Sequence, residues 1–355
     1  MEFLAAGIAG VASHITYFRR GEHHLYGQYY FQGFFVIFTL ALALLYFPDQ
    51  DDLKASFLSV GRLSICYLIG LFSSLVIYRL ILDPLNKFPG LVGAKISGLW
   101  ISFRFRRCDG YKQAQKLHEE YGLFVRVGSS DLSIAHPQAV EALYGPKSKC
   151  IKGSYYDLTK PMVSMQTFRD RSQHDARRRI WSAAFSDNAI RGYEKRIKSY
   201  QDKMIALLQA SDGTPVNITN LLSIYNFDVV GDLAFGKSFD LLENPGSQLH
   251  WAVELLREGL KPLAFLFPIW FLRFMTKIPF LARDWWRFIG FCRNRLIQRM
   301  KESPDIPDIM SVLLAPLEGH QPSEQEMNLL VGDSQLILGA GRRVLITTIT
   351  SQIKI

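Results

Sequence analysis

The chain has 355 residues, of which 48% are hydrophobic, and its formal net charge at pH 7 is +9. A basic, apolar chain suits an anionic membrane surface or an acidic redox partner, and the absence of any nucleic-acid-binding motif argues against a nucleic-acid partner. The chain has four cysteines: Cys66, Cys108, Cys150 and Cys292. They form no CxxC pair, which argues against a zinc site or a disulfide framework.

Apolar stretches at residues 1–18, 31–47 and 63–78 predict a membrane anchor. The second and third stretches, with their flanks, are long enough to span a bilayer. The first stretch is weaker because it contains His14. It does not have the form of a signal peptide, since no basic residue precedes its apolar part.

The charges of the loops indicate the orientation of this anchor. Arg19 and Arg20 lie in the first loop, and acidic residues dominate the second loop. Six cations follow the third stretch: Arg79, Lys87, Lys95, Arg104, Arg106 and Arg107. By the positive-inside rule, the first loop and everything after residue 79 face the cytosol, which requires three spans and a lumenal N-terminus. The alternative is one span with two buried or interfacial segments.

The segment DPLNKFPGLVG, residues 83–93, contains two prolines and two glycines, which end any helix. It predicts a short, stiff hinge between a membrane anchor, residues 1–82, and a cytosolic body, residues 94–355.

The body has a helical pattern almost throughout, so we predict a mainly α fold with a small β-sheet. Alternating residues on both sides of GSSD, within residues 123–136, predict a β-hairpin. The predicted helices cover residues 111–122, 137–145, 172–185, 188–210, 217–235, 247–260, 282–302, 305–315 and 323–355. Residues 263–281 are apolar but interrupted by Pro268 and Pro279, and they either contact the membrane surface, roof an apolar pocket or form core helices.

The segment HDARRRIWSAAFS, residues 174–186, is basic at its start and apolar at its end. His174, Arg178, Trp181 and Phe185 are spaced by four, three and four residues, which places them on one face of a helix. Such a face suits a flat, apolar ligand with an anionic edge. The alternative is a solvated basic stripe beside a Trp–Phe pair that faces the core.

The last predicted helix contains Gly339, Ala340 and Gly341 near its middle. Because an interior glycine weakens a helix, small residues here indicate either that something flat approaches the backbone or that two helices pack closely.

Taken together, these segments resemble the cytochrome P450 superfamily in its membrane-anchored fungal form, over about residues 83–341. The matching segments, in family order, are PLNKFPG, LHEEYGLFVRVGSSDLSIAHPQAVEALYG, HDARRRIWSAAFS, NFDVVGDLAFGKSFDLL and VGDSQLILGAG. The loop RRGEHH and the start with three apolar stretches are similar, more weakly, to fungal indole-alkaloid hydroxylases of this superfamily.

The resemblance implies a haem (heme) cofactor and a monooxygenase of the endoplasmic reticulum membrane whose body faces the cytosol. The resemblance also implies three partners: membrane lipid, NADPH–cytochrome P450 reductase and a lipophilic small-molecule substrate. The substrate would belong to secondary metabolism. By carry-over, His174 and Arg178 bind the haem propionates, and Trp181 packs or donates at the haem edge. Ala340 and Gly341 lie beside the haem on the central helix.

The sequence departs from the family pattern after Gly341. Arg343 and Val344 stand where the family has an acidic residue and a threonine that relay protons. The loop F-x-x-G-x-R-x-C-x-G, which carries the axial thiolate, does not occur up to Ile355. From the sequence we therefore expect a C-terminally truncated cytochrome P450 domain over residues 94–355 that ends within the central helix and is inactive. A non-catalytic membrane-anchored remnant or binding protein is the alternative, and a gene-model error is one explanation.

Overall fold

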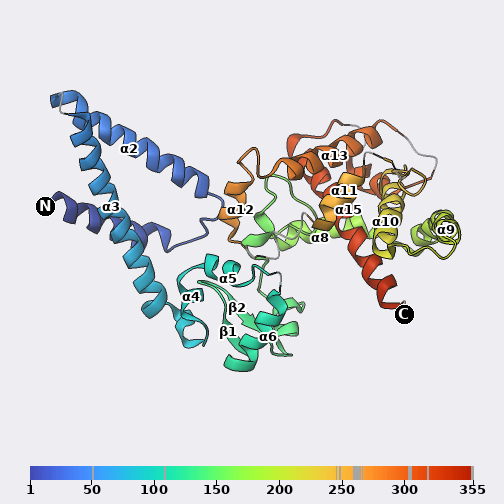
Figure 1. Cartoon of the computed structure of the whole chain (residues 1–355), viewed down its shortest axis with the longest axis horizontal. Helices are drawn as coiled ribbons and strands as arrows, with labels where there is room; N and C mark the ends of the chain where they lie inside the picture. The colour runs from blue at the N-terminus through green and yellow to red at the C-terminus, as the bar shows by residue number, and fades with distance from the viewer. Residues whose placement is uncertain are drawn as a thin grey trace. The chain divides into compact units, whose positions relative to one another are not determined.

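The computed structural model describes residues 1–49, 52–107, 109–244, 246–247, 249–258, 265, 267–302, 306–317 and 320–352 (Figure 1). Of residues 48–49, 257–258 and 341–352 it describes the backbone only. The chain forms two compact units: Met1–Cys150 with Lys261–Ile278, and Ile151–Leu260 with Pro279–Ile355. The predicted fold class is confirmed, since the described chain is mainly helical with one two-stranded sheet.

The first unit begins with three apolar helices: α1 (Glu2–Ser13), α2 (Gly27–Asp49) and α3 (Leu53–Ile77). A π-helical turn extends α1 to Phe18, and another extends α3 to Leu82. Among the described residues, two segments are long and apolar enough to cross a membrane, Gly27–Phe47 and Leu53–Leu82. Their most apolar windows are not buried inside the protein, which leaves their side chains available to lipid.

Helix α1 packs on α3 through glycine. A Cβ atom added at Gly10 would collide with the backbone of α3 at Tyr67, and one added at Gly70 would collide with the backbone of Gly7. Small residues let helix backbones approach closely in this way. Farther along, the buried His14 hydrogen-bonds through Nδ1 to the Ser74 hydroxyl at 2.9 Å, which explains how an apolar stretch accommodates a histidine.

The same contacts give the relative direction of α1 and α3. Gly7 lies against Gly70, and His14 lies against Ser74, so positions increase together along both helices. The two helices therefore run in the same direction.

The predicted hinge is a short 3-10 turn, Pro84–Lys87, followed by α4 (Val92–Ile96) and α5 (Gly98–Arg104). Its start is capped by Asp83, whose Oδ1 accepts the backbone N–H of Leu85 at 2.8 Å. The prolines and glycines end the long helix as expected.

Arg126, at the end of the first strand, fixes the hinge to the body. Its side chain is 1% exposed, and its guanidinium donates to the side-chain oxygen of Asn86 at 2.8 Å and to the carbonyl of Ser129 at 2.7 Å. The Oδ2 atom of Asp83 lies 3.3 Å from the same group, and the backbone N–H of Arg126 donates to the carbonyl of Pro89 at 2.7 Å. The hinge is thus held by a buried cation rather than left as a free linker.

The small sheet pairs β1 (Phe124–Arg126) with β2 (Leu132–Ile134) in antiparallel register, with Val125 opposite Ser133, which confirms the predicted hairpin. Helices α6 (Gly110–Tyr121) and α7 (Ala139–Tyr144) flank it. The apolar segment with two prolines contains α12 (Ile269–Met275), which packs on α2, with the rings of Phe31 and Phe274 5.6 Å apart.

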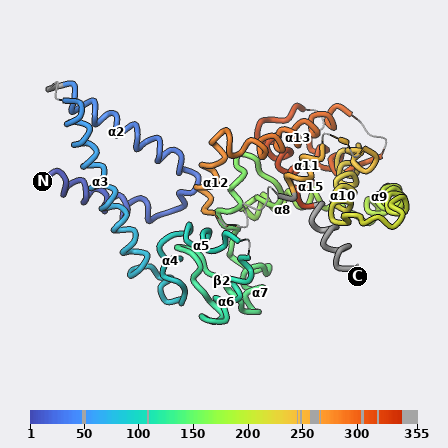
Figure 2. The backbone as a smooth tube through the Cα atoms, in the orientation of Figure 1, coloured from blue at the N-terminus to red at the C-terminus, as the bar shows by residue number. Residues whose placement is uncertain are grey.

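The second unit is a helical bundle. Its helices are α8 (Arg171–Ala184), α9 (Asp187–Gln209), α10 (Ile218–Phe235), α11 (His250–Glu258), α13 (Arg283–Met300), α14 (Ile309–Leu314) and α15 (Glu324–Gln352). Two 3-10 turns, Ser154–Asp157 and Ala315–Leu317, complete it. Helix α10 packs against α9, α11, α13, α14 and α15. Figure 2 shows α10 next to α9. The core includes Phe227, Phe288, Leu296 and Leu338, each at most 2% exposed.

Helix α10 also holds a buried carboxylate. Asp228 accepts the backbone N–H groups of Leu241 at 3.0 Å and Leu242 at 2.8 Å, which folds the segment after α10 back onto the helix. Burial raises the pKa of Asp228, and this effect outweighs the two N–H donors, which lower it.

Replacing Asp228 by Asn is expected to change how stability depends on pH. Because the folded chain binds this proton more tightly than the unfolded chain, the carboxyl contributes full stability below its unfolded pKa of about 3.9 and loses it as pH rises through the folded pKa. Relative to the wild type, D228N should therefore become more stable as pH rises above about 4. Denaturant unfolding at a series of pH values measures this, and a pH-independent difference would contradict it.

Candidate functional site

Helix α8 presents two adjacent strips of side chains. It begins at Arg171 because Asp170 caps it, with Oδ1 accepting the N–H of Gln173 at 2.9 Å. The first strip faces the core and includes Arg177 and Trp181. The second strip borders it toward solvent and comprises His174, Arg178 and Phe185.

The structure separates the predicted site residues of α8. His174 is half-buried, with Nδ1 2.9 Å from the Asp175 carboxylate, and Arg178 is exposed. Trp181 is turned inward, 7% exposed, and its indole N–H donates to a buried carboxylate at 3.3 Å. Because this carboxylate already binds the indole N–H, Trp181 could contact a ligand only by packing its ring against it. Its ring stacks at 6.1 Å on Phe185, which is 50% exposed and carries the aromatic surface outward.

The buried carboxylate is Asp333 of α15, which the sequence reasoning missed. Its side chain is fully buried and accepts three donors: Arg177 Nε at 2.7 Å, the backbone N–H of Met165 at 2.9 Å and the Trp181 indole. Burial raises the pKa of Asp333, while Arg177 acts in the opposite direction. The sequence signal for this residue was an acidic side chain among the apolar residues of 331–338, because a buried acid needs a hydrogen-bonding or cationic partner.

Close packing beside Asp333 gives way to open space farther along α15. A Cβ atom at Gly332 would collide with the carbonyl group of Val163, so the loop before α8 touches the helix backbone here. A Cβ atom at Gly339 would meet nothing within 4 Å, and Ala340 is exposed. Among the described residues, no atom packs against the position of a Cβ at Gly339.

Ala340 follows Asp333 by seven residues, or two helical turns, so both lie on the side of α15 that α8 contacts. The surroundings of Gly341, and the side chains of Arg343 and Val344, lie outside the described residues. Arg177 and Trp181 of α8 therefore contact α15 two turns before the exposed Ala340, on the same side of the helix.

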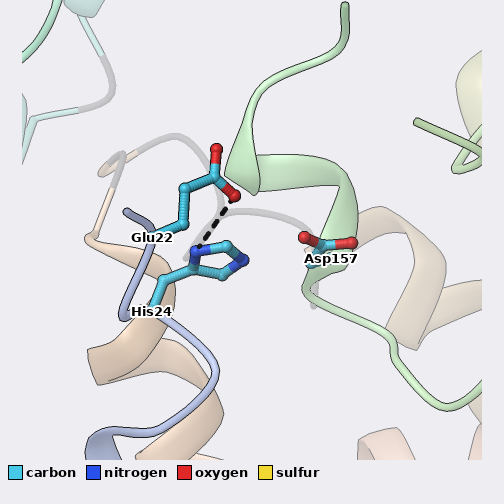
Figure 3. A group of neighbouring side chains, drawn as sticks. All are labelled: Glu22, His24 and Asp157. Carbon is cyan, nitrogen blue, oxygen red and sulfur yellow. Dashed lines mark ion pairs between the residues drawn. The ribbon is translucent and has the colours of Figure 1, made fainter. Parts of the chain in front are cut away.

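Three ion pairs outside α8 involve the residues in Figure 3. In the loop between α1 and α2, a carboxylate oxygen of Glu22 lies 3.7 Å from Nδ1 of His24 (Figure 3). Asp157 belongs to the other unit, where Arg169 donates to its Oδ2 at 2.7 Å and Lys160 lies 2.8 Å from its Oδ1. Each carboxylate is thus balanced within its own unit, and we assign no metal site to these side chains.

Comparison with known proteins gives the class of the protein. The family model for cytochrome P450 matches residues 92–351, and the chain belongs to this family.

The similar curated proteins are fungal monooxygenases. The chain is 44% identical, over 98% of its length, to tryprostatin B 6-hydroxylase of Aspergillus fumigatus, and 44% identical over the same share to the Neosartorya fischeri protein of that name. It is 43% identical over 98% of its length to the cytochrome P450 monooxygenase notG' of Aspergillus versicolor. The chain spans 63%, 64% and 64% of the length of these relatives.

Proposed function

We propose that this chain forms the propionate-binding and central-helix part of a membrane-bound haem-thiolate monooxygenase that hydroxylates a lipophilic small molecule in secondary metabolism. One observation carries the proposal. In a chain of the cytochrome P450 family, Arg177 and Trp181 of α8 bind Asp333 of α15, two helical turns before the exposed Ala340, and the strip with His174 and Arg178 borders them.

The donor set fits a haem. The guanidinium of Arg178 and the neighbouring imidazole of His174 suit two propionates, and the arginine fork matches a carboxylate with two parallel hydrogen bonds. Half-exposed Phe185 offers an aromatic surface for a flat apolar ring system, and Gly339 and Ala340 present backbone without bulky side chains. When bound, the haem would supply the oxygen chemistry, while these residues hold and orient it.

The substrate proposal rests on the relatives. Two of them are named for hydroxylation of tryprostatin B, so we propose a lipophilic secondary metabolite of a similar kind. The exposed basic residues of α8 suit an acidic electron-donor domain, and we propose NADPH–cytochrome P450 reductase for that role.

Replacing Arg178 by Ala is expected to weaken haemin binding about tenfold, the scale of one charge-assisted hydrogen bond. Arg179→Ala is the matched control, because Arg179 is equally exposed on α8 but lies outside the strip that contains His174. The measurement is a titration of the detergent-solubilised chain with haemin, followed by the Soret band. Equal affinities for both variants, or a folded chain that takes up no haemin, would favour the non-catalytic remnant or binding protein.

We propose that residues 1–82 form a three-span anchor in the endoplasmic reticulum membrane, with the hinge 83–93 leading to a cytosolic body from residue 94 onward. The parallel course of α1 and α3 supports this number of spans. The guanidinium of Arg19 lies 4.6 Å over the ring of Tyr78, so the basic loop after α1 and the basic end of α3 share one end of the anchor.

A glycosylation sequon fused before Met1 is expected to be modified in microsomes, because three spans place the N-terminus in the lumen. The native sequon at Asn217 should stay unmodified, since it lies in the cytosolic body. Endoglycosidase shifts on a gel report both sites. An unmodified N-terminal sequon would favour two spans, and modification of Asn217 would reverse the orientation of the body.

A further inference from the structure

We propose that Asp333 is a positioning residue for the cofactor. Its carboxylate fixes the rotation of α8 about its own axis and the position of α8 along α15. This inference rests on the proposed haem site and identifies what holds its two halves together.

Three donors converge on this carboxylate from one continuous stretch of chain. Arg177 and Trp181 lie one turn apart on α8, and Met165 lies in the loop before it. In contrast, the buried Asp308 pairs with Arg299 of α13 at 2.6 Å and caps its own helix. Asp333 therefore ties α15 to α8 and to the loop that leads into it.

The position of Arg177 determines the direction in which the second strip of α8, with His174 and Arg178, faces. It directly precedes Arg178 and follows His174 by three residues, so fixing its guanidinium fixes the rotation of α8 about its axis. Without its carboxylate, the guanidinium would be buried and uncompensated. Rotation of α8 would then let Arg177 reach solvent and would move Arg178, with the rest of its strip, away from the position beside α15.

The carboxylate of Asp333 also sets the position of α8 along the axis of α15. Trp181 donates to Oδ2 of Asp333 and the Met165 amide donates to Oδ1, and the close approach of Val163 to Gly332 prevents the loop from sliding. Ala340 follows two turns later on α15. The carboxylate of Asp333 thus sets the distance between Arg178 on α8 and Ala340 on α15.

The test compares haemin with haemin dimethyl ester, in which both propionates are blocked. We expect the wild-type chain to prefer haemin about tenfold or more, because only free propionates pair with the cations. Asp333→Asn should reduce this preference at least about fivefold. Asp228→Asn is the matched control, because the donors to this buried carboxylate, the Ser238 side chain and the backbone N–H groups of Leu241 and Leu242, all lie in the segment just after its own helix, and the variant should keep the preference. A purely structural effect would weaken both ligands equally and leave their ratio unchanged.

The double variant R177M/D333L covers the case in which D333N does not fold. Apolar side chains of similar volume can replace a buried ion pair without loss of stability, so this variant is expected to unfold cooperatively and still lose the preference for haemin. A preference retained in the folded double variant overturns the positioning role. A wild-type chain that binds both porphyrins equally overturns the proposed haem site instead, which separates the two failures. Faster hydrogen exchange at the Met165 amide in the double variant is expected without any porphyrin, and unchanged exchange there also counts against the role.

Discussion

Replacing Gly332 by Ala is expected to destabilise the second unit by at least about 2 kcal/mol, although alanine is the better helix former. A Cβ atom at this position collides with the backbone carbonyl of Val163, which cannot rotate away as a side chain would. The loop has to move, and the hydrogen bond from the Met165 amide to Asp333 lengthens with it.

The same helix offers a matched control. Gly339 is also an interior glycine of α15, but a Cβ atom there meets nothing within 4 Å, so Gly339→Ala should stabilise the helix by up to about 1 kcal/mol. Chemical denaturation of the two variants gives the comparison. Equal changes of the same sign would show that close packing at Gly332 is not what distinguishes these positions.

Replacing Arg126 by Leu is expected to cost about 3–5 kcal/mol, the scale for leaving a buried charge without its partner. The substitution removes the donors of the Asn86 and Ser129 oxygens and leaves the Asp83 carboxylate without its cation. The hinge should then detach from β1 while the remaining body stays folded.

Limited trypsin digestion reports this change locally, because Lys87 is an exposed cleavage site within the hinge. Cleavage after Lys87 should accelerate strongly in R126L microsomes. Arg107→Leu is the control, since it removes an exposed arginine from the same unit. If Lys87 is cut at the same rate in both variants, the buried guanidinium does not hold the hinge.

Much of this fold could be predicted because its signals are local. Helix periodicity and the turn residues around GSSD depend on neighbours within a few positions, and the corresponding elements are present. The hinge was predicted from its prolines for the same reason. Its attachment to Arg126 could not be predicted, because alternation in β1 shows only which side a residue faces and not that a cation is buried there.

The candidate site was predicted only in part. Helical spacing grouped Trp181 with His174 and Arg178, but spacing does not show where the core begins. The ring is turned inward because its N–H and the neighbouring Arg177 share the carboxylate of Asp333, which lies more than 150 residues farther along the chain. A contact of that range follows from tertiary packing, and a single sequence carries no direct signal for it.

Haemin uptake by the full chain is the measurement that tests the central claim most directly. The detergent-solubilised chain is titrated with haemin beside its Arg178→Ala and Arg179→Ala variants. We predict saturable uptake that Arg178→Ala weakens about tenfold and Arg179→Ala leaves unchanged. Cooperative unfolding together with no saturable uptake, or equal uptake by both variants, would contradict the assignment of α8 and α15 to a haem site.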